Sequence, residues 1–202
     1  MQSNQSKWTP VRLTLLCALT IAGDTLAAGS EPREVTALTF RPFTYGEYRD
    51  ALAKVDEKDD DAVFEALAVL ATGEPLAVIE QLKQPDYLAL AQQVKKYVKS
   101  STEDYLGAPA DPDLIELLMP IDDAGQPRTS VRLTMPALKA VKVMKKMTGA
   151  DQRSAWITAH CAGFFAPDDC RALSIPDWNQ LQGRIGDFLN QPAAFFQKTM
   201  ST

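Results

Sequence analysis

The chain of 202 residues carries an internal repeat, and this feature limits its fold more than any other. One set of positions recurs after 90 residues and a second set after 91, which indicates one inserted residue between the sets. The first set pairs Thr44, Asp61 and Gly73 with Thr134, Asp151 and Gly163. The second pairs Leu82, Pro85, Asp86, Leu90, Val94, Tyr97 and Val98 with Leu173, Pro176, Asp177, Leu181, Ile185, Phe188 and Leu189. Because self-similarity at a fixed period is typical of a repeated supersecondary unit, the sequence predicts one architecture used twice.

Each copy begins with two segments in which β-branched and polar residues alternate, a pattern typical of the strands of a hairpin. The strands are predicted at 13–21 and 35–40 in the first copy, and at 114–121 and 129–133 in the second. A long loop at 22–34 and a tight turn at 122–127 are expected to join them. The difference in loop length explains why the two hairpins are about 102 residues apart before the turn and near 93 after it.

Helices are expected to follow each hairpin. Thr44 and Glu47 have the spacing of a capping box, and Thr134 with Pro136 two residues later predicts the corresponding helix start, ending near 148–149. Second helices are predicted from Asp61 to Gly73 and from Asp151 to Gly163, with glycine at the C-terminal end. An amphipathic helix then closes each copy, after a short helix from Pro75 in the first.

These elements predict an α+β fold of two similar units, each a β-hairpin followed by three to four short helices. The first unit is expected at 1–99 and a second, diverged unit at 114–202. Between them, residues 100–113 contain Gly107, Pro109 and Pro112 with little apolar periodicity, which indicates a linker.

The N-terminus allows a second interpretation. Lys7 and Arg12 precede the apolar stretch 13–23, and residues 26–29 resemble the cleavage site of a secretory signal. The counterpart of this stretch at 115–125 favours a structural strand, because a signal peptide has no reason to recur in mid-chain. At about 11 residues, against the roughly 20 that a helix needs, the stretch is too short to span a bilayer.

Composition excludes some functions. Lys and Arg total 21 against 26 Asp and Glu, and this net charge of −5 disfavours nucleic-acid binding. Three cysteines, Cys17, Cys161 and Cys170, suit a reducing compartment better than a disulfide framework. A Cys161–Cys170 bridge belongs to the alternative of an exported protein.

Four polar clusters were considered as sites of chemistry, and none has the spacing of an established site. His160 and Cys161 with Asp168, Asp169 and Cys170 contain zinc-ligand types, but adjacent His and Cys on a helix point to different sides. The acidic run 56–61 lacks the alternating carboxylates, central Gly and closing Glu of an EF-hand loop. Lysines 139, 142, 145 and 146 are interpreted as the solvated face of a helix with Leu138, Val141 and Met144 inward, and Glu116, Asp122 and Asp123 as strand and turn residues.

No catalytic, cofactor-binding or metal-binding residue is therefore predicted, and the partner-binding surface is unknown from sequence. The absence of a convergent polar constellation favours binding over catalysis. An apolar groove for an amphipathic partner helix would suit such a protein.

The first copy resembles the tail assembly chaperones of P2-like and Mu-like tailed phages. The resemblance lies in 38–44, the Leu-Ala-Thr-Gly segment 70–73, the short helix from Pro75 and the segment 85–90. The second copy resembles this family more weakly, through 162–163 and 176–178. These are packing and turn residues, and the tandem duplication departs from the commoner single copy.

The resemblance implies a non-virion assembly factor, encoded by a phage or prophage, that binds the helical tape measure protein in the host cytoplasm. No cofactor, nucleic acid or membrane is implied as a partner, and a homo-oligomer is compatible with the sequence. Two alternatives stay open: an exported bacterial protein with a cleaved N-terminus, and a tail or baseplate component that stays in the virion.

Overall fold

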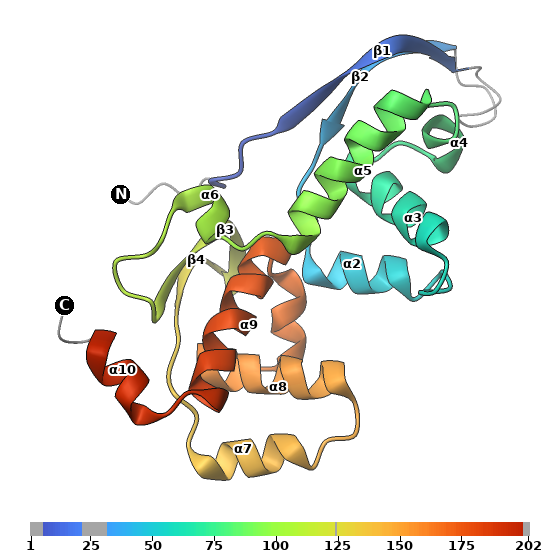
Figure 1. The fold of residues 1–202 in the computed structure, drawn as a ribbon. Coiled ribbons are helices and arrows are strands. Elements are labelled where there is room, and N and C mark those ends of the chain that lie inside the picture. The colour runs from blue at the N-terminus through green and yellow to red at the C-terminus, as the bar shows by residue number, and fades with distance from the viewer. Residues whose placement is uncertain (1–5, 22–31, 124, 200–202) are drawn as a thin grey trace. The chain divides into compact units, whose positions relative to one another are not determined.

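The computed structural model describes residues 6–21, 32–123 and 125–199, and the protein has the predicted α+β fold (Figure 1). The chain divides into two compact units: an N-terminal unit of Lys7–Ser100, and a C-terminal unit from Ser101 onward that also includes Ser6. The proposed cleavage site at 26–29 lies outside the described residues. Within the described ranges, no helix combines the length and apolar character needed to cross a membrane.

The N-terminal unit is a hairpin followed by helices. Strands β1 (Val11–Ile21) and β2 (Arg33–Phe40) pair antiparallel, which confirms that the apolar N-terminal stretch forms a strand. The helices are α2 (Tyr45–Leu52), α3 (Asp60–Thr72), α4 (Leu76–Ile79) and α5 (Gln84–Lys99). The predicted capping box begins α2: Thr44 Oγ1 accepts the amide of Glu47 at 3.1 Å, and the Glu47 carboxylate accepts the amide of Thr44 at 2.8 Å.

The C-terminal unit has the same order of elements. Helix α6 (Glu103–Leu106) lies in the segment where a linker was expected, ahead of the hairpin of β3 (Leu114–Asp123) and β4 (Gln126–Arg132). The remaining elements are α7 (Leu138–Lys145), α8 (Ala150–Ala162), the 3₁₀ helix η1 (Pro167–Ala172), α9 (Ile175–Asn190) and α10 (Ala193–Thr199).

The two hairpins pair in the same register. The β1 and β3 counterparts are 102 residues apart and those of β2 and β4 are 93 apart, so that Leu13 faces Leu38 in one hairpin and Ile115 faces Val131 in the other. Both hairpins break their register at the same place, between Thr14 and Leu19 and between Glu116 and Ile121. Each first strand therefore carries an irregular segment of equal length.

The long helices also correspond. Helices α3 and α8 each have 13 residues and begin 90 residues apart, and α5 and α9 each have 16 and begin 91 apart. As predicted, α3 ends at Gly73 (φ 72°) and α8 ends at Gly163 (φ 66°), both left-handed. Glycine adopts this conformation without the steric cost that a Cβ brings.

The prediction that Thr134 caps the second unit's first helix is wrong. Helix α7 begins at Leu138 with Ala137 in the N-cap position, and it ends at Lys145 rather than near 148–149. Thr134 instead donates its amide to the carbonyl of Cys161 at 2.9 Å, as Arg41 does to Ala71 at 2.7 Å. The physical reason is that α2 and α7 keep the hairpin spacing of 93 between counterparts. The loop before α8 is shorter than the loop before α3, which reduces the spacing to 90 from there on.

Each unit buries a core between its hairpin and its helices. In the N-terminal unit the Tyr97 ring meets Phe43, Phe40 and Trp8 with centroid distances of 4.6, 5.4 and 5.4 Å. In the C-terminal unit, Leu117 and Leu118 of β3 are buried, and so are Leu173 and Leu181. Apolar burial of this kind is the main stabilising contribution to such small units.

Candidate partner-binding surfaces

His160, Cys161 and Cys170 lie in and just after α8 in the C-terminal unit. No group of three or more His, Cys, Asp or Glu side chains in the described ranges is placed to hold a metal ion. His160 stacks on Trp156 at 5.4 Å with the rings 3° from parallel. Burial raises the pKa of Cys161 to about 11 and that of Cys170 to about 12, and both are free thiols. Such thiols stay protonated at neutral pH, which makes them inert.

The acidic run 56–61 has local structural roles at two of its positions. Asp59 caps α3, because its Oδ1 accepts the amide of Ala62 at 3.1 Å. Asp56 accepts the amide of Lys58 at 3.0 Å within the loop. All six residues of the run are exposed, so the run presents negative charge to solvent at the N-terminal end of α3.

The charged residues of α7 and of the second hairpin are also placed by the structure. Lysines 139, 142 and 145 of α7 and Lys146 just after it are exposed as predicted, but Leu138, expected to face inward, is 69% exposed. It occupies the first position of the helix, two residues before the buried Ala140 and therefore on nearly the opposite side of the helix. Asp122 accepts the amide of Gly125 at 2.6 Å, and Asp123 pairs with Arg128 at 3.2 Å, which are turn contacts.

One buried carboxylate in each unit fixes the irregular strand segment to the last long helix. Asp86 of α5 accepts the amide of Leu16 at 3.0 and 3.2 Å. Asp177 of α9, fully buried, accepts the amides of Leu118 at 2.7 Å and Met119 at 3.2 Å. Leu16 and Leu118 are 102 residues apart, so the same contact occurs at corresponding positions.

Asp177 accepts two further hydrogen bonds, from Thr102 Oγ1 at 2.7 Å and from Ser174 Oγ at 2.6 Å. Burial nevertheless raises the pKa of Asp177 above its ordinary value, against the lowering effect of these donors. These carboxylates were not recognised as buried from sequence, where the Pro-Asp pairs were interpreted as turn residues. Their recurrence after 91 residues was the available signal.

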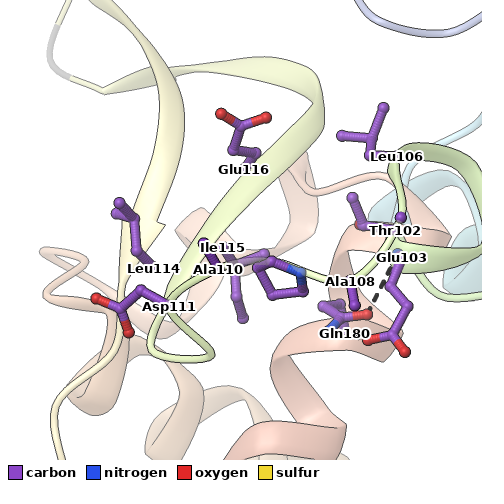
Figure 2. Close-up of a pocket in the computed structure, with 12 residues that line it drawn as sticks. Thr102, Glu103, Leu106, Ala108, Ala110, Asp111, Leu114, Ile115, Glu116 and Gln180 are labelled. Carbon is purple, nitrogen blue, oxygen red and sulfur yellow. Dashed lines mark hydrogen bonds between the residues drawn. The ribbon is translucent and has the colours of Figure 1, made fainter. Parts of the chain in front are cut away.

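A pocket of about 350 Å³ lies in the C-terminal unit beside α6 (Figure 2). Its apolar lining comes from Leu106, Pro109, Leu114 and Ile115, and Figure 2 shows the carboxylates of Glu103, Asp111 and Glu116 on different sides of it.

Neighbouring side chains hold Glu103 and Asp111. Gln180 Nε2 donates to Glu103 at 3.2 Å, and Arg132 pairs with Asp111 at 3.0 Å. The amide of Asp113 and the Arg132 guanidinium lower the pKa of Asp111. The pocket thus combines apolar walls with a fixed acidic rim, and it is built mainly from the segment 102–116.

An apolar groove of about 460 Å³ lies in the N-terminal unit between α2, α3 and the start of α4. Seven of the nine residues that line it are apolar: Ala51, Val55, Ala62, Ala66, Val69, Leu70 and Leu76. The other two are Lys54 and Glu65. Small and branched side chains on two adjacent helices form the kind of depression into which an amphipathic helix packs.

The corresponding face of α8 in the C-terminal unit carries different residues. With the spacing of 90, Ala66 corresponds to Trp156 and Leu70 to His160, the stacked pair. An indole and an imidazole therefore cover the helix face that is open in the N-terminal unit. Trp156 is visible in the sequence, but the groove that lies at the position of its counterpart is not.

Comparison with known proteins finds a family similarity in the C-terminal unit. Residues 114–190 match the family model described as "Phage tail assembly chaperone proteins, E, or 41 or 14". The match begins at the first residue of β3 and ends at the last residue of α9, so it covers a complete hairpin-to-helix unit. Neither the curated proteins nor the solved structures contain a match.

The family match falls on the copy in which the resemblance had been judged weaker from sequence. It supports a role in phage tail assembly. Residues 114–190 are therefore similar to the family of phage tail assembly chaperones.

Proposed function

We propose that this chain is a non-catalytic assembly factor that binds the tape measure protein of a phage or prophage in the host cytoplasm and keeps it soluble during tail assembly. The observation that carries the proposal is the family match over a complete structural unit, from β3 to α9. The tape measure protein enters as the partner implied by the family resemblance.

The proposal includes a division of the chain into two copies of one chaperone unit, at 1–99 and 114–202, joined by the segment 100–113. Several features support a duplication: the common hairpin register, the equal lengths of the long helices and the buried Asp in each unit. All changes in spacing between counterparts fall between elements, where insertions cost little stability.

A binding role rather than catalysis is supported by the chemistry of the described residues. The buried thiols have raised pKa values, and the buried carboxylate Asp177 is occupied by four donors. What the described surface offers instead is an apolar groove in one unit and a pocket with apolar walls in the other.

Co-expression with the tape measure protein encoded beside this chain tests the proposal. We expect the two proteins to co-purify, and the soluble fraction of the tape measure protein to rise relative to expression alone. The matched control is co-expression with an unrelated acidic protein of similar size. Absence of both co-purification and increased solubility would remove the proposed function.

Two further measurements separate the alternatives. Mass spectrometry of purified particles should not detect this chain, because a chaperone leaves the assembled tail. A baseplate component would be detected. N-terminal sequencing after expression in a bacterium should give the intact start. Cleavage after Ala28 would instead support an exported protein.

A further inference from the structure

We propose that the groove between α2, α3 and α4 of the N-terminal unit docks an amphipathic helix with a basic flank, supplied by a partner protein. The identification of this partner with the client of a tail assembly chaperone rests on the proposed function. The docking itself rests on the shape, the apolar lining and the charge of the groove.

The lining suits a helix because small side chains lie between larger ones. Three alanines, Ala51, Ala62 and Ala66, let a second helix approach closely, while Val69 and Leu70 of α3 supply apolar contact. Leu76 at the start of α4 is 41% exposed, so it leaves apolar surface open to solvent in the lining of the groove. Burial of this surface would favour association.

The length of the groove fits a short helical segment. The α3 residues that line it run from Ala62 to Leu70, which at the rise of an α-helix corresponds to about 12 Å, or roughly two turns. Apolar residues at i, i+3, i+4 and i+7 of a partner helix cover the same distance.

The charge around the groove selects the polar face of the partner. Val55 and Ala62 line one end, and the residues between them include five carboxylates and one lysine, all exposed: Asp56, Glu57, Lys58, Asp59, Asp60 and Asp61. Within the lining, Glu65 adds a carboxylate and Lys54 a positive charge, so that carboxylates outnumber lysines by six to two around the groove. A helix whose flank carries Lys or Arg is therefore attracted and oriented, and an acidic helix is repelled.

The C-terminal unit indicates the chemistry of the occupant. Where the groove has Ala66 and Leu70, α8 carries Trp156 stacked on His160. In that unit the chain's own aromatic side chains cover the helix face. In the N-terminal unit, large apolar or aromatic side chains of a partner would take this place.

The direct test uses a designed helical peptide of about 14 residues, with a Leu stripe and Lys on its polar face, and a second peptide with Glu in place of Lys. Fluorescence anisotropy on the full chain should show preference for the Lys peptide, and this preference should weaken with salt. The variant Ala66→Trp, which places the second unit's residue in the groove, should reduce affinity for the Lys peptide about tenfold or more.

Leu88→Trp is the matched control, since Leu88 is 49% exposed on α5 and is not part of the groove lining. It should leave the affinity unchanged. Glu65→Lys provides a test that does not depend on filling the groove. It should lower the affinity for the Lys peptide and raise the affinity for the Glu peptide. Equal binding of both peptides by the wild type, or equal losses in Ala66→Trp and Leu88→Trp, would overturn the docking site.

Two outcomes distinguish this inference from the proposed function. If the wild type binds the Lys peptide but not the tape measure protein, the docking site is supported and the tape measure protein is excluded as the partner. If Ala66→Trp loses the peptide yet still solubilises the tape measure protein, the groove is not the client site. Concentration-dependent self-association that Ala66→Trp abolishes would identify a second copy as the occupant and contradict the proposal.

Discussion

The two units attach their hairpins to their last long helices by the same contact, but the carboxylate that makes this contact differs in its surroundings and in its number of hydrogen-bond donors. In the N-terminal unit, Asp86 accepts a hydrogen bond from the amide of Leu16, whose own side chain is exposed. In the C-terminal unit, Asp177 is fully buried and gathers four donors. A common architecture therefore does not imply that corresponding residues contribute equally to stability.

A second difference concerns the other end of the same helices. Tyr97 of α5 bonds both backbone groups of Phe43, accepting its amide at 3.1 Å and donating to its carbonyl at 2.7 Å. Its counterpart in α9 is Phe188, which has no hydroxyl, and the counterpart of Phe43 is Pro136, which has no amide hydrogen. The C-terminal unit therefore lacks both the amide donor, at Pro136, and the hydroxyl acceptor, at Phe188, so that neither group is left without its partner.

The largest expected effect comes from Asp177→Ala. The buried amide of Leu118, the part-buried amide of Met119 and the Thr102 hydroxyl would lose their acceptor, and each buried donor left without one costs about 1–3 kcal/mol. We expect the free energy of unfolding to fall by about 4 kcal/mol, and by only about 1–2 kcal/mol for Asp86→Ala, in urea unfolding followed by circular dichroism. Equal losses in the two variants would contradict the difference between the units.

An intermediate effect is expected for Tyr97→Phe. The change strands the amide and carbonyl of Phe43 in the aromatic core, at a cost of about 2 kcal/mol. The reciprocal variant Phe188→Tyr should change stability by less than about 0.5 kcal/mol, because no amide hydrogen awaits the hydroxyl. Thermal unfolding of both variants measures the pair, and a large loss in Phe188→Tyr would show that the correspondence is incorrect.

The sequence predicted those parts of the fold that depend on local patterns. Strand alternation located the hairpins, the Thr44 and Glu47 spacing located α2, and Gly73 and Gly163 located the ends of α3 and α8. Each of these signals is contained within a few residues of the element that it marks. The repeat strengthened the signals for the hairpins and the helix ends, because each of these occurred twice.

Features that depend on contacts between distant segments were missed. The burial of Asp177 follows from amides 58 and 59 residues away, which no local pattern reveals. The prediction of a helix cap at Thr134 is wrong because it rested on a second threonine 90 residues after Thr44. The helix start follows the hairpin spacing of 93 instead. The groove depends on how α2 and α3 pack, although its alanines and the Trp156 of the other copy were visible in the sequence.

A smaller and equal effect is expected at the two glycines that end α3 and α8. Neither would bring a new Cβ within 4 Å of other atoms, so the cost of Gly73→Ala and Gly163→Ala is only that of the left-handed backbone. This cost is about 1 kcal/mol in each case. Urea unfolding of both variants should give matching losses, and a clear difference would mean that the two helix ends are not equivalent.

The smallest effect tests the first helix start of each unit, where the two units differ. Thr44 caps α2, whereas Ala137 has extended backbone angles of −65° and 152° at the same position before α7 but no oxygen to accept an amide. Thr44→Ala should therefore cost about 1 kcal/mol, and Ala137→Ser should add about 0.5 kcal/mol to the free energy of unfolding. Ala137→Gly is the control, because it keeps the extended backbone accessible without a hydroxyl. If Ala137→Ser stabilises the chain no more than this control, then α7 does not begin as α2 does, and the correspondence at a spacing of 93 ends with the hairpin.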